Sequence, residues 1–417
     1  MNDKDYDNVR EHTTVNQPRR PLEGLRVLEL GALVAGPFAT RLFAEFGAEV
    51  IKVEAPGSGD PLRNWRYIDP RTGASLWWSL QSRNKKLITL NLKHPEGLEI
   101  AKRLIAKCDI LLENFRPGTL EHLGLGWEVL HEVNPRLIVT RISGYGQTGP
   151  YTEKPGFGSV GEVMGGLRYV TGFPEQPPVR SGISLGDSLA SLYAVIGTLM
   201  AIYSRDVQRT GEGQMVDVGL YEAVFSLMES TLPDYDVAGV IRSRTGNALP
   251  GIAPTNTYRA ADGSYIVIGA NSDPIFRRLM QAIGRADIAD APEYSDNAGR
   301  ARQADQLDDA IEGWTSTHTP EEILAVLDEA KVPAGPIYSI ADIVDDEQYK
   351  ARDMIREDEV DGIGKVKMPG LVPKLSATPG SIDWYGGRMG THNAEVYGRL
   401  LSLSPAQIAS LSEEGVI

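Results

Sequence analysis

The chain has 417 residues, and 42 Lys and Arg against 56 Asp and Glu give it a formal net charge of −14. This excess of acid disfavours a nucleic-acid-binding protein, because such proteins need surplus Lys and Arg to displace the counterions of the phosphate backbone. The length predicts two or three domains that can fold without disulfides. The one cysteine, Cys108, can form neither an intramolecular disulfide nor a Cys-based zinc site, so a cytoplasmic location is expected.

Neither the N-terminus nor the longest apolar stretch indicates a membrane protein. Residues 1–20 are polar and mixed in charge, without the apolar region of a signal peptide, and are predicted to form a disordered tail. The apolar stretch 189–203 is interrupted by Ser, Thr and Gly and falls short of the roughly 20 residues that span a bilayer. A buried core helix is predicted for it.

From Pro21 onward, short apolar runs alternate with helical patterns. Strands are predicted at 26–30 and 49–54, joined by a helix over 37–46 with Pro in its first turn. Such a β–α–β unit implies a parallel sheet. A further helix is predicted over 95–107, and further strands at 86–92, 109–113 and 137–142. This part of the chain therefore predicts an open, doubly wound α/β domain with a Rossmann-like sheet.

The middle of the chain has a different pattern. A Gly- and Pro-rich loop at 144–178 precedes predicted helices at 187–205 and 221–230, with a strand at 214–218 between them. Residues 234–256 are loop-like. Two short strands and three helices then predict a smaller α+β domain, at 257–258, 265–270, 274–283, 307–315 and 320–329. Residues 21–230 are predicted to form the N-terminal part of the large domain, and residues 231–335 the small domain.

The familiar catalytic motifs are missing. Gly31 and Gly36 follow the first strand, but the string between them lacks the second glycine of a dinucleotide fingerprint. The sequence also contains no phosphate loop, no H-E-x-x-H and no G-x-S-x-G. Neither an ATP-driven nor a zinc-dependent mechanism is supported, and no metal site or tightly bound cofactor is predicted.

Basic residues gather between 83 and 107, and two interpretations are open. They could form a solvated face, or they could form a patch for phosphate groups. The second is favoured by the string Asn114-Phe115-Arg116 directly after a predicted parallel strand, since ligands of such sheets bind beyond the carboxyl ends of the strands. The basic residues are Arg83, Lys85, Lys86, Lys93, Lys102, Arg103 and Lys107.

Asp187 stands directly before a run of helical apolar residues. It could be the N-cap of that helix, which is the usual role of an Asp at such a position. A carboxylate at a helix N-terminus is also kept ionised by the helix dipole, and only the ionised form can act as a nucleophile. Both interpretations remain open from the residues alone.

Taken together, several strings resemble the family III coenzyme A transferases, which include formyl-CoA transferase, carnitine-CoA transferase and the α-methylacyl-CoA racemases. The resemblance covers nearly all of the chain after the tail, and it depends on the order and spacing of the strings. They are PLEGLRVLEL (21–30), AGP (35–37), GAEVIKVE (47–54), NK (84–85), ENFRPG (113–118), GYGQTGP (144–150) and LGDS (185–188).

The resemblance implies a large α/β domain built from both chain ends, with residues 336–417 returning to it, and an interlocked homodimer. It implies that Asp187 attacks the thioester of an acyl-CoA and later carries CoA as an aspartyl thioester. Acyl-CoA and a small carboxylic acid would be the substrates, with no other cofactor. Thioester exchange is nearly isoenergetic, so neither ATP nor a metal is required.

Carried over by position, the resemblance places residues from several segments at the CoA site. The turn at Leu33 and Val34 would approach the thioester. His122 stands where the formyl enzyme has Arg, and Val34 replaces a glutamine of that enzyme. A glycine-rich lid loop of the formyl enzyme corresponds to a region with the single Gly251. The remaining residues expected at the CoA site are Leu90, Lys93, Asn114, Phe115 and Arg116.

Phe157 bears on the choice between transfer and racemisation. The racemases pair their Asp with a His at the position of Phe157, and a phenyl ring cannot move a proton. Transfer is therefore favoured, with a racemase as the alternative and a non-catalytic CoA-binding protein as an alternative of another class. Arg168 and Arg180 flank the loop before Asp187 and could pair with a distal carboxylate, which favours succinyl-CoA as donor and a dicarboxylic acceptor. They could equally be surface residues.

Overall fold

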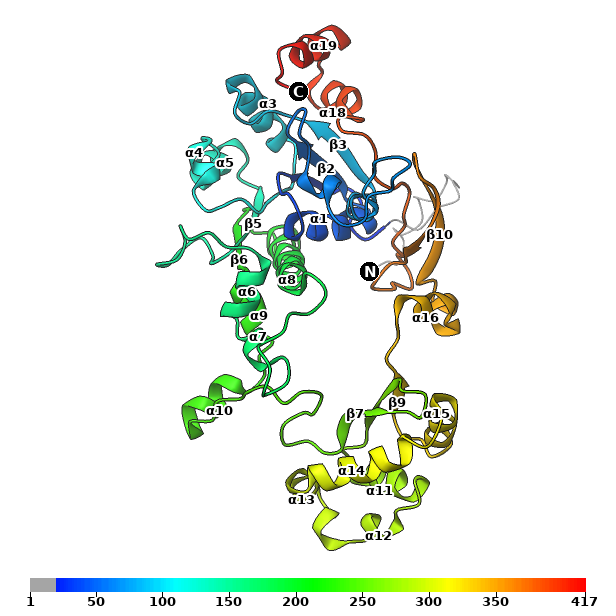
Figure 1. Cartoon of the computed structure of the whole chain (residues 1–417). Helices are drawn as coiled ribbons and strands as arrows, with labels where there is room; N and C mark the ends of the chain where they lie inside the picture. The colour runs from blue at the N-terminus through cyan, green and yellow to red at the C-terminus, as the bar shows by residue number, and fades with distance from the viewer. Residues whose placement is uncertain (1–19) are drawn as a thin grey trace, which may run out of the picture. The chain divides into compact units, whose positions relative to one another are not determined.

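The computed structural model describes residues 20–417, so the predicted tail at 1–20 lies outside the described residues except for Arg20. The contacts divide the chain into two units (Figure 1). The first unit joins the described residues up to Gly165 with Ile183–Leu227 and Asp353–Ile417, and the second joins Gly166–Gly182 with Met228–Arg352. Both ends of the described chain therefore belong to the first unit.

The first unit contains a six-stranded parallel sheet in the order β3-β2-β1-β4-β5-β6. This order confirms the predicted open, doubly wound α/β domain. The direction of winding reverses between β1 and β4, which leaves a crevice at the carboxyl ends of these two strands. The strands are β1 (Arg26–Glu29), β2 (Glu49–Glu54), β3 (Lys85–Thr89), β4 (Ile110–Glu113), β5 (Ile138–Ser143) and β6 (Met215–Gly219).

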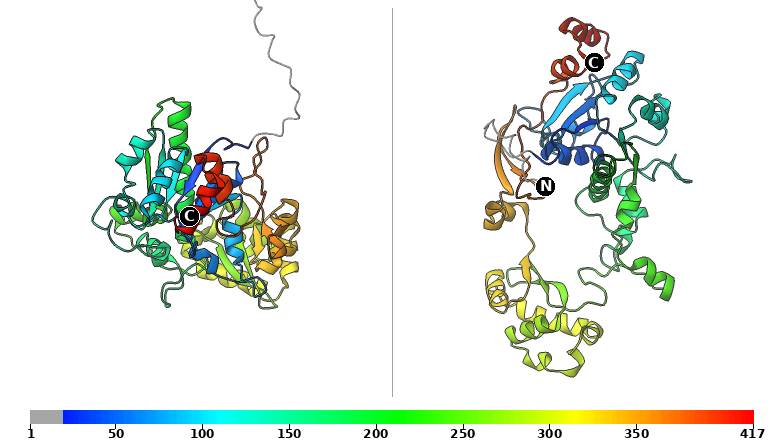
Figure 2. Two further views of the ribbon diagram at one scale, coloured as in Figure 1. Left: turned by 90° about the horizontal axis from the view of Figure 1, so that it is seen from above. Right: turned by 180° about the vertical axis from the view of Figure 1, so that it is seen from behind.

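Helices cover both faces of the sheet, as a parallel sheet requires. Val27 and Leu28 are neighbours in β1, yet they belong to two separate buried clusters, one on each face. One face carries α1 (Ala35–Glu45), α8 (Leu185–Ile202) and α9 (Leu220–Phe225). The other carries α3 (Pro95–Ile105), α5 (Trp127–Val133), α18 (Asn393–Leu401) and α19 (Pro405–Glu413). Figures 1 and 2 show α18 beside β3, so the chain's last helices complete the domain begun at its start.

Helix α8 continues into a π-helical turn, η2 (Tyr203–Val207). Among residues 20–417, the run Leu185–Val207 is the one helix long and apolar enough to cross a membrane, so the expectation of a shorter run was wrong. A core helix of a soluble protein passes the same test, and α8 packs against α1, β5 and β6. The predicted burial applies to one face, which carries Ala190, Ser191, Ala194, Thr198 and Ala201; Leu192, Ile196, Met200 and Tyr203 are exposed.

The second unit is the predicted α+β domain, built on an antiparallel sheet in the order β7-β8-β9. The sheet packs against three principal helices around one core. Its strands are β7 (Thr255–Arg259), β8 (Tyr265–Gly269) and β9 (Ala334–Pro336), and its helices include α11 (Asp273–Ala282), α14 (Ala304–Thr315) and α15 (Pro320–Glu329). Strand β9 pairs with β8, and the chain returns to the first unit at Asp353, later than the predicted boundary at 336.

Several short elements were not predicted. Helix α10 (Thr231–Ala238) occupies the start of the predicted loop 234–256. Strand β10 (Ile355–Val360) pairs within the first unit with β11 (Gly364–Pro369), where the sequence does predict a strand near 364–368. The other short elements are η1 (Pro61–Asn64), α2 (Leu76–Gln81), α4 (Thr119–His122), α6 (Gly158–Met164), α7 (Leu167–Val170), α12 (Ala286–Ala289), η3 (Pro292–Tyr294), α13 (Asn297–Arg302), α16 (Ile340–Asp345) and α17 (Glu347–Ala351).

Candidate active site

A cavity of about 750 Å³ lies in the first unit at the carboxyl ends of β1, β2, β3 and β4. Ligands of doubly wound sheets bind at this edge, beside the point where the strand order reverses. Three residues expected at the CoA site line the cavity: Leu90, which is buried, Lys93, which is exposed, and Phe115. The cavity is also lined by Gly31, Ala32, Lys52, Asp60, Thr119, Leu123 and Gly415.

The β1–α1 turn (Gly31–Val34) is held by Asn114. The Asn114 Oδ1 accepts a hydrogen bond from Ala32 N at 2.7 Å, and Nδ2 donates to Ala32 O at 2.9 Å. Gly31 and Gly36 leave room for this amide, since a Cβ at either position would lie 2.7 or 3.0 Å from Oδ1. Asn114 thus positions the turn with both ends of its amide, and the cavity lining does not include it.

Buried charged side chains also hold the β1–α1 turn in place. The Lys52 Nζ lies 3.1 Å from a Glu29 oxygen and 2.8 Å from an Asp60 oxygen, and it donates to Gly31 O. Asp60 Oδ1 accepts from Leu33 N at 3.1 Å, which helps to hold Leu33 at a φ of 65°. Burial alone would lower the pKa of Lys52, but the two carboxylates raise it above its ordinary value. Sequence reasoning missed Lys52 and Asp60, which gave no local signal.

Glu113, at the end of β4, fixes the backbone of Phe115. Its two oxygens accept from Phe115 N at 2.6 Å and from Arg141 Nε at 2.7 Å. Burial raises the pKa of Glu113 to about 7 against these hydrogen bonds. Arg116 is exposed, and the His122 Nδ1 lies 2.5 Å from Gly118 O; neither side chain lines the cavity.

The basic cluster is neither one solvated face nor one phosphate patch. Arg83 and Lys85 are buried and paired with Glu45 and Glu29 at 3.1 and 2.9 Å. Burial lowers the pKa of Lys85 to about 8, although Glu29 opposes the shift. Among the residues of the cluster, Lys93 is the one that lines the cavity. The sequence could not distinguish the buried basic residues of this cluster from the exposed ones, because their spacing carries no information about burial.

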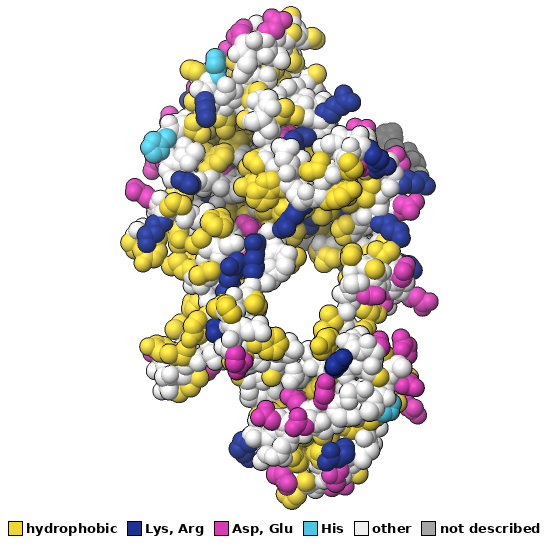
Figure 3. Space-filling model, viewed as in Figure 1, with side chains coloured by type: hydrophobic (Ala, Val, Ile, Leu, Met, Phe, Trp, Pro, Cys, Tyr) yellow, Lys and Arg dark blue, Asp and Glu magenta, His cyan; other side chains and the backbone are white. Residues whose placement is uncertain are grey.

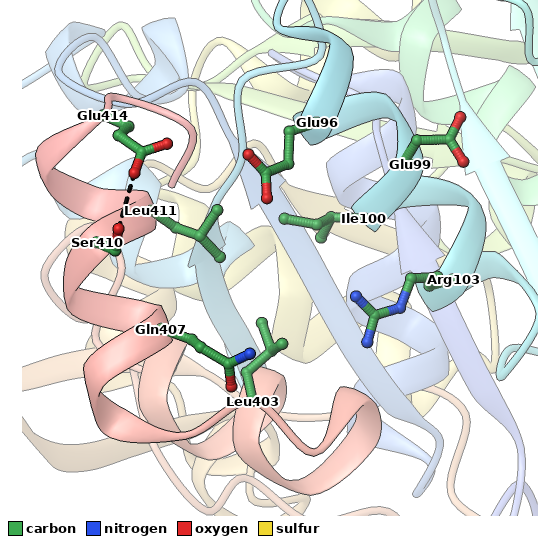
Figure 4. A pocket seen from close by; sticks show the side chains of 9 residues that line it. All are labelled: Glu96, Glu99, Ile100, Arg103, Leu403, Gln407, Ser410, Leu411 and Glu414. Carbon is green, nitrogen blue, oxygen red and sulfur yellow. Dashed lines mark hydrogen bonds between the residues drawn. The ribbon is translucent and has the colours of Figure 1, made fainter.

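A second cavity, of about 280 Å³, lies between α3 and α19 (Figure 4). Arg103 lines it together with three glutamates, Glu96, Glu99 and Glu414. The excess of carboxylates disfavours a phosphate ligand there. Arg103 also donates to Leu401 O at 3.0 Å, which ties α3 to the end of α18.

Asp187 lies inside the first turn of α8 and is not its N-cap, because the helix begins at Leu185 and Ser184 occupies the cap position. The Ser191 hydroxyl lies 2.7 Å from both Asp187 O and Ala35 O, and so joins this turn to the start of α1. Asp187 is half-buried, and a carboxylate in the first turn is favoured by the helix dipole. The N-cap interpretation of Asp187 was therefore wrong.

The α6–α8 contact (Gly158, Glu162, Gly186 and Asp187) lies at this turn. A Cβ on Gly158 would lie 2.1 Å from the Asp187 Oδ2. Glu162 is buried, and its Oε1 accepts from Gly186 N at 3.3 Å. Phe157 precedes the contact as the N-cap residue of α6 and is 63% exposed. Sequence reasoning singled out Phe157 but missed Gly158 and Glu162.

The remaining predicted site residues belong to the second unit. Arg168 lies on α7 and is half-buried, Arg180 is exposed, and Gly251 has a φ of 73° beside a short bridge between Leu249 and Ile252. Their expected meeting with Asp187 stays a prediction. No group of three His, Cys, Asp or Glu side chains among residues 20–417 could hold a metal ion.

Comparison with known proteins identifies the class. The family model for CoA-transferase family III matches residues 22–393, so the chain belongs to that family and is a CoA-transferase. It is 52% identical over 404 residues to a succinyl-CoA–D-citramalate CoA-transferase of Chloroflexus aurantiacus, covering 96% of this chain and 99% of that protein. The beta subunit of a succinyl-CoA–L-malate CoA-transferase from the same organism is 41% identical, with coverage of 95% and 98%. Among solved structures, a CaiB/BaiF family protein from Brucella suis is 32% identical, with a TM-score of 0.80 over 92% of this chain and 100% of that one.

Proposed function

We propose that the enzyme transfers CoA from succinyl-CoA to a small dicarboxylate, with Asp187 as its nucleophile. The position of Asp187 carries the proposal: a carboxylate in the first turn of α8, joined through Ser191 to the start of α1, which follows the turn lining the 750 Å³ cavity. The names of the relatives support the substrates, because the citramalate and malate enzymes both use succinyl-CoA and a hydroxylated dicarboxylate.

The proposed reaction proceeds by four acyl transfers without water. The Asp187 carboxylate attacks the succinyl thioester and displaces CoA thiolate, which leaves a mixed succinyl–aspartyl anhydride. The thiolate attacks the aspartyl carbonyl, releasing succinate and forming an aspartyl-CoA thioester. The acceptor carboxylate displaces the thiolate to form a second anhydride. The thiolate then attacks the acceptor's acyl carbonyl, giving the new acyl-CoA and the free Asp187 carboxylate.

The CoA is proposed to occupy the cavity at the carboxyl ends of β1 to β4. Lys93 supplies a positive charge at its rim for a phosphate group, while Leu90 and Phe115 supply apolar contact. The β1–α1 turn lines the same cavity through Gly31 and Ala32. Charged side chains bind the phosphate groups of a ligand such as CoA, and apolar side chains pack against the rest of it. The cavity offers both kinds of side chain.

Arg168 and Arg180 are proposed to bind the distal carboxylate of the acceptor. A guanidinium suits this role because it forms two parallel hydrogen bonds with a carboxylate. Arg180→Gln and Arg168→Gln are expected to raise the KM for dicarboxylates while leaving the KM for succinyl-CoA nearly unchanged. An unchanged KM for dicarboxylates in both variants would indicate that these arginines are surface residues without a role in acceptor binding.

A homodimer is proposed because large apolar side chains are exposed side by side on α8 and on α10, and such exposed apolar faces mark interaction surfaces. Figure 3 shows hydrophobic side chains over α10, where Leu232, Tyr235 and Val237 are 56, 57 and 85% exposed. The exposed face of α8 adds Ile196 and Met200. Sedimentation at micromolar concentration is expected to give a dimer, and a monomer would contradict this assembly. A cytoplasmic location is also proposed.

The test combines an acceptor panel with variants at position 187. With succinyl-CoA as donor, citramalate and malate are expected to be better acceptors than oxalate, glutarate, itaconate and carnitine. Asp187→Ala and Asp187→Asn should lower kcat by at least about a thousandfold, as loss of a covalent nucleophile does, while CoA affinity is retained. Activity confined to monocarboxylates would contradict the acceptor class. CoA binding without transfer to any acceptor would support a non-catalytic protein, and exchange of the α-proton would support a racemase.

A further inference from the structure

Helix α6 meets the proposed nucleophile at its first residue. Figure 1 shows α6 close to α8 and α9, and α6 packs against both helices. A Cβ on Gly158 would lie 2.1 Å from Oδ2, 2.6 Å from Cγ and 3.0 Å from Oδ1 of Asp187. Carbon atoms do not approach other atoms so closely without a shift of one of them. The Asp187 carboxylate therefore occupies the space in which any residue other than glycine at position 158 has its Cβ.

The contact extends to the peptide before Asp187. A Cβ on Gly186 would lie 2.7 Å from Gly158 O, so the two backbones are as close as glycines allow. One turn further along α6, the buried Glu162 accepts a hydrogen bond from Gly186 N through Oε1. In α8, the Gly186 N–H is one of the first-turn donors that have no partner within the helix. Glu162 thus satisfies that donor and holds the backbone that carries Asp187.

We propose that Gly158 and Glu162 are positioning residues for the transfer reaction, which together set the place of the Asp187 carboxylate. Gly158 provides the room that the carboxylate occupies, and Glu162 fixes the backbone from which it extends. The inference rests on the proposed role of Asp187 as nucleophile. A nucleophile must lie within about 3–3.5 Å of the carbon that it attacks, and a displacement of about 1 Å can cost a hundredfold in rate.

The other glycines of α6 differ from Gly158 in what they contact. Cβ atoms on Gly161 and Gly165 would meet the Cβ atoms of Leu220 and Val224 at 2.8 and 2.6 Å, which is the close packing of α6 against α9. Packing explains these two glycines fully. At Gly158 the neighbour is instead the end of one short side chain, the Asp187 carboxylate. A methyl group there should displace the carboxylate while leaving the fold intact.

The first test is Gly158→Ala. It should lower kcat at least about a hundredfold, while the Kd for CoA stays within about twofold and the Tm does not fall. The amount of CoA trapped on the peptide containing Asp187 should fall with kcat. Gly398→Ala is the matched control, because Gly398 lies within α18 and its Cβ would find the nearest atom at an ordinary 3.7 Å. Parental kcat in Gly158→Ala would overturn the proposed role of Gly158.

The second test separates positioning from packing at Glu162. Glu162→Gln keeps an acceptor oxygen for Gly186 N and should retain most of kcat. Glu162→Ala removes the acceptor and should lower kcat about tenfold or more with an unchanged KM for succinyl-CoA. Equal kcat in the Gln and Ala variants, or losses of Tm and CoA affinity that match the loss of kcat, would overturn the positioning role of Glu162.

Different results would refute the nucleophile role of Asp187 and the positioning roles of Gly158 and Glu162. Full turnover by Asp187→Ala would refute the nucleophile, and with it the inference. Loss of turnover in Asp187→Ala together with parental turnover in Gly158→Ala and Glu162→Ala would leave the nucleophile in place and refute the α6–α8 contact as a positioning device.

Discussion

The β1–α1 turn and the α6–α8 contact both depend on glycine, but the glycines leave room for side chains with different tasks. Asn114 lies between Gly31 and Gly36 with both ends of its amide bonded to Ala32. Asp187 lies against Gly158 in the first turn of α8, where Gly186 N donates to Glu162 and the Asp187 carbonyl accepts from the Ser191 hydroxyl. A side chain that only supports a binding turn can be fixed by its own polar atoms. A carboxylate that forms a covalent bond in every cycle must reach the carbon that it attacks, so the room that Gly158 leaves for it should affect the rate more than the stability.

The largest expected effect comes from breaking the charges beneath the β1–α1 turn. Lys52→Met leaves the buried Asp60 without its cation, while Glu29 keeps Lys85, and an uncompensated buried charge costs about 3–5 kcal/mol. Denaturant unfolding of the variant and the parent measures this loss. A change in unfolding free energy below about 1 kcal/mol would show that the turn does not depend on this group.

Acid should weaken the same region through Glu29 and Asp60. Burial opposes ionisation of both carboxyls, but Lys52 and further hydrogen bonds hold their pKa values below the ordinary ones. A lowered carboxyl pKa contributes stability above the unfolded-state pKa, and that stability is lost as the pH falls through the folded-state pKa. Unfolding free energy should therefore decline below about pH 4.5, and less steeply in Lys52→Met than in the parent. Identical slopes would contradict the assignment.

Asn114→Ala tests the amide that supports the turn. It leaves the Ala32 N–H and carbonyl without their partner, and loss of these bonds should cost about 2 kcal/mol. Because the turn also lines the cavity, the Kd for CoA should rise. This variant sharpens the comparison with Gly158→Ala, which is expected to change kcat without changing stability or CoA affinity. The same pattern of losses in both variants would erase the distinction between the two regions.

The smallest effect is expected at the rim of the cavity. Lys93→Glu should raise the KM for succinyl-CoA several-fold, because it replaces an attractive charge with a repulsive one at a screened, exposed position. Raising the salt concentration should narrow the difference from the parent. Lys107→Glu is the control, since Lys107 is an exposed member of the same basic cluster that does not line the cavity. Equal effects of the two substitutions would indicate a general charge effect.

The sequence predicted the sheet well because its strands are buried on both faces and appear as short runs of Val, Ile and Leu. Strand β2 was predicted at its observed bounds of Glu49–Glu54, and β1, β4 and β5 within one residue at either end. Helix α6 was missed because its glycines and small residues have weak helical propensity. They are used for close packing against α8 and α9, which only the folded chain reveals.

The candidate site was predictable where family strings mark it and not where it depends on contacts between distant segments. Lys93 and Phe115, which the family strings mark, do line one cavity, and their contact with CoA stays a prediction. Arg83 and Lys85 were not distinguished from surface lysines, because only the fold shows them paired within the core. Gly158 carries no signal of its own in the sequence, and its meaning comes from the group that it leaves room for, the Asp187 carboxylate.

The central claim is that Asp187 carries CoA as a covalent thioester, and mass spectrometry tests it most directly. The enzyme is incubated with succinyl-CoA, treated with hydroxylamine or borohydride, and digested. The account predicts a modification confined to the peptide that contains Asp187, dependent on the acyl-CoA and missing from Asp187→Ala. Transfer activity with no modification of that peptide, or with modification of another residue, would contradict it.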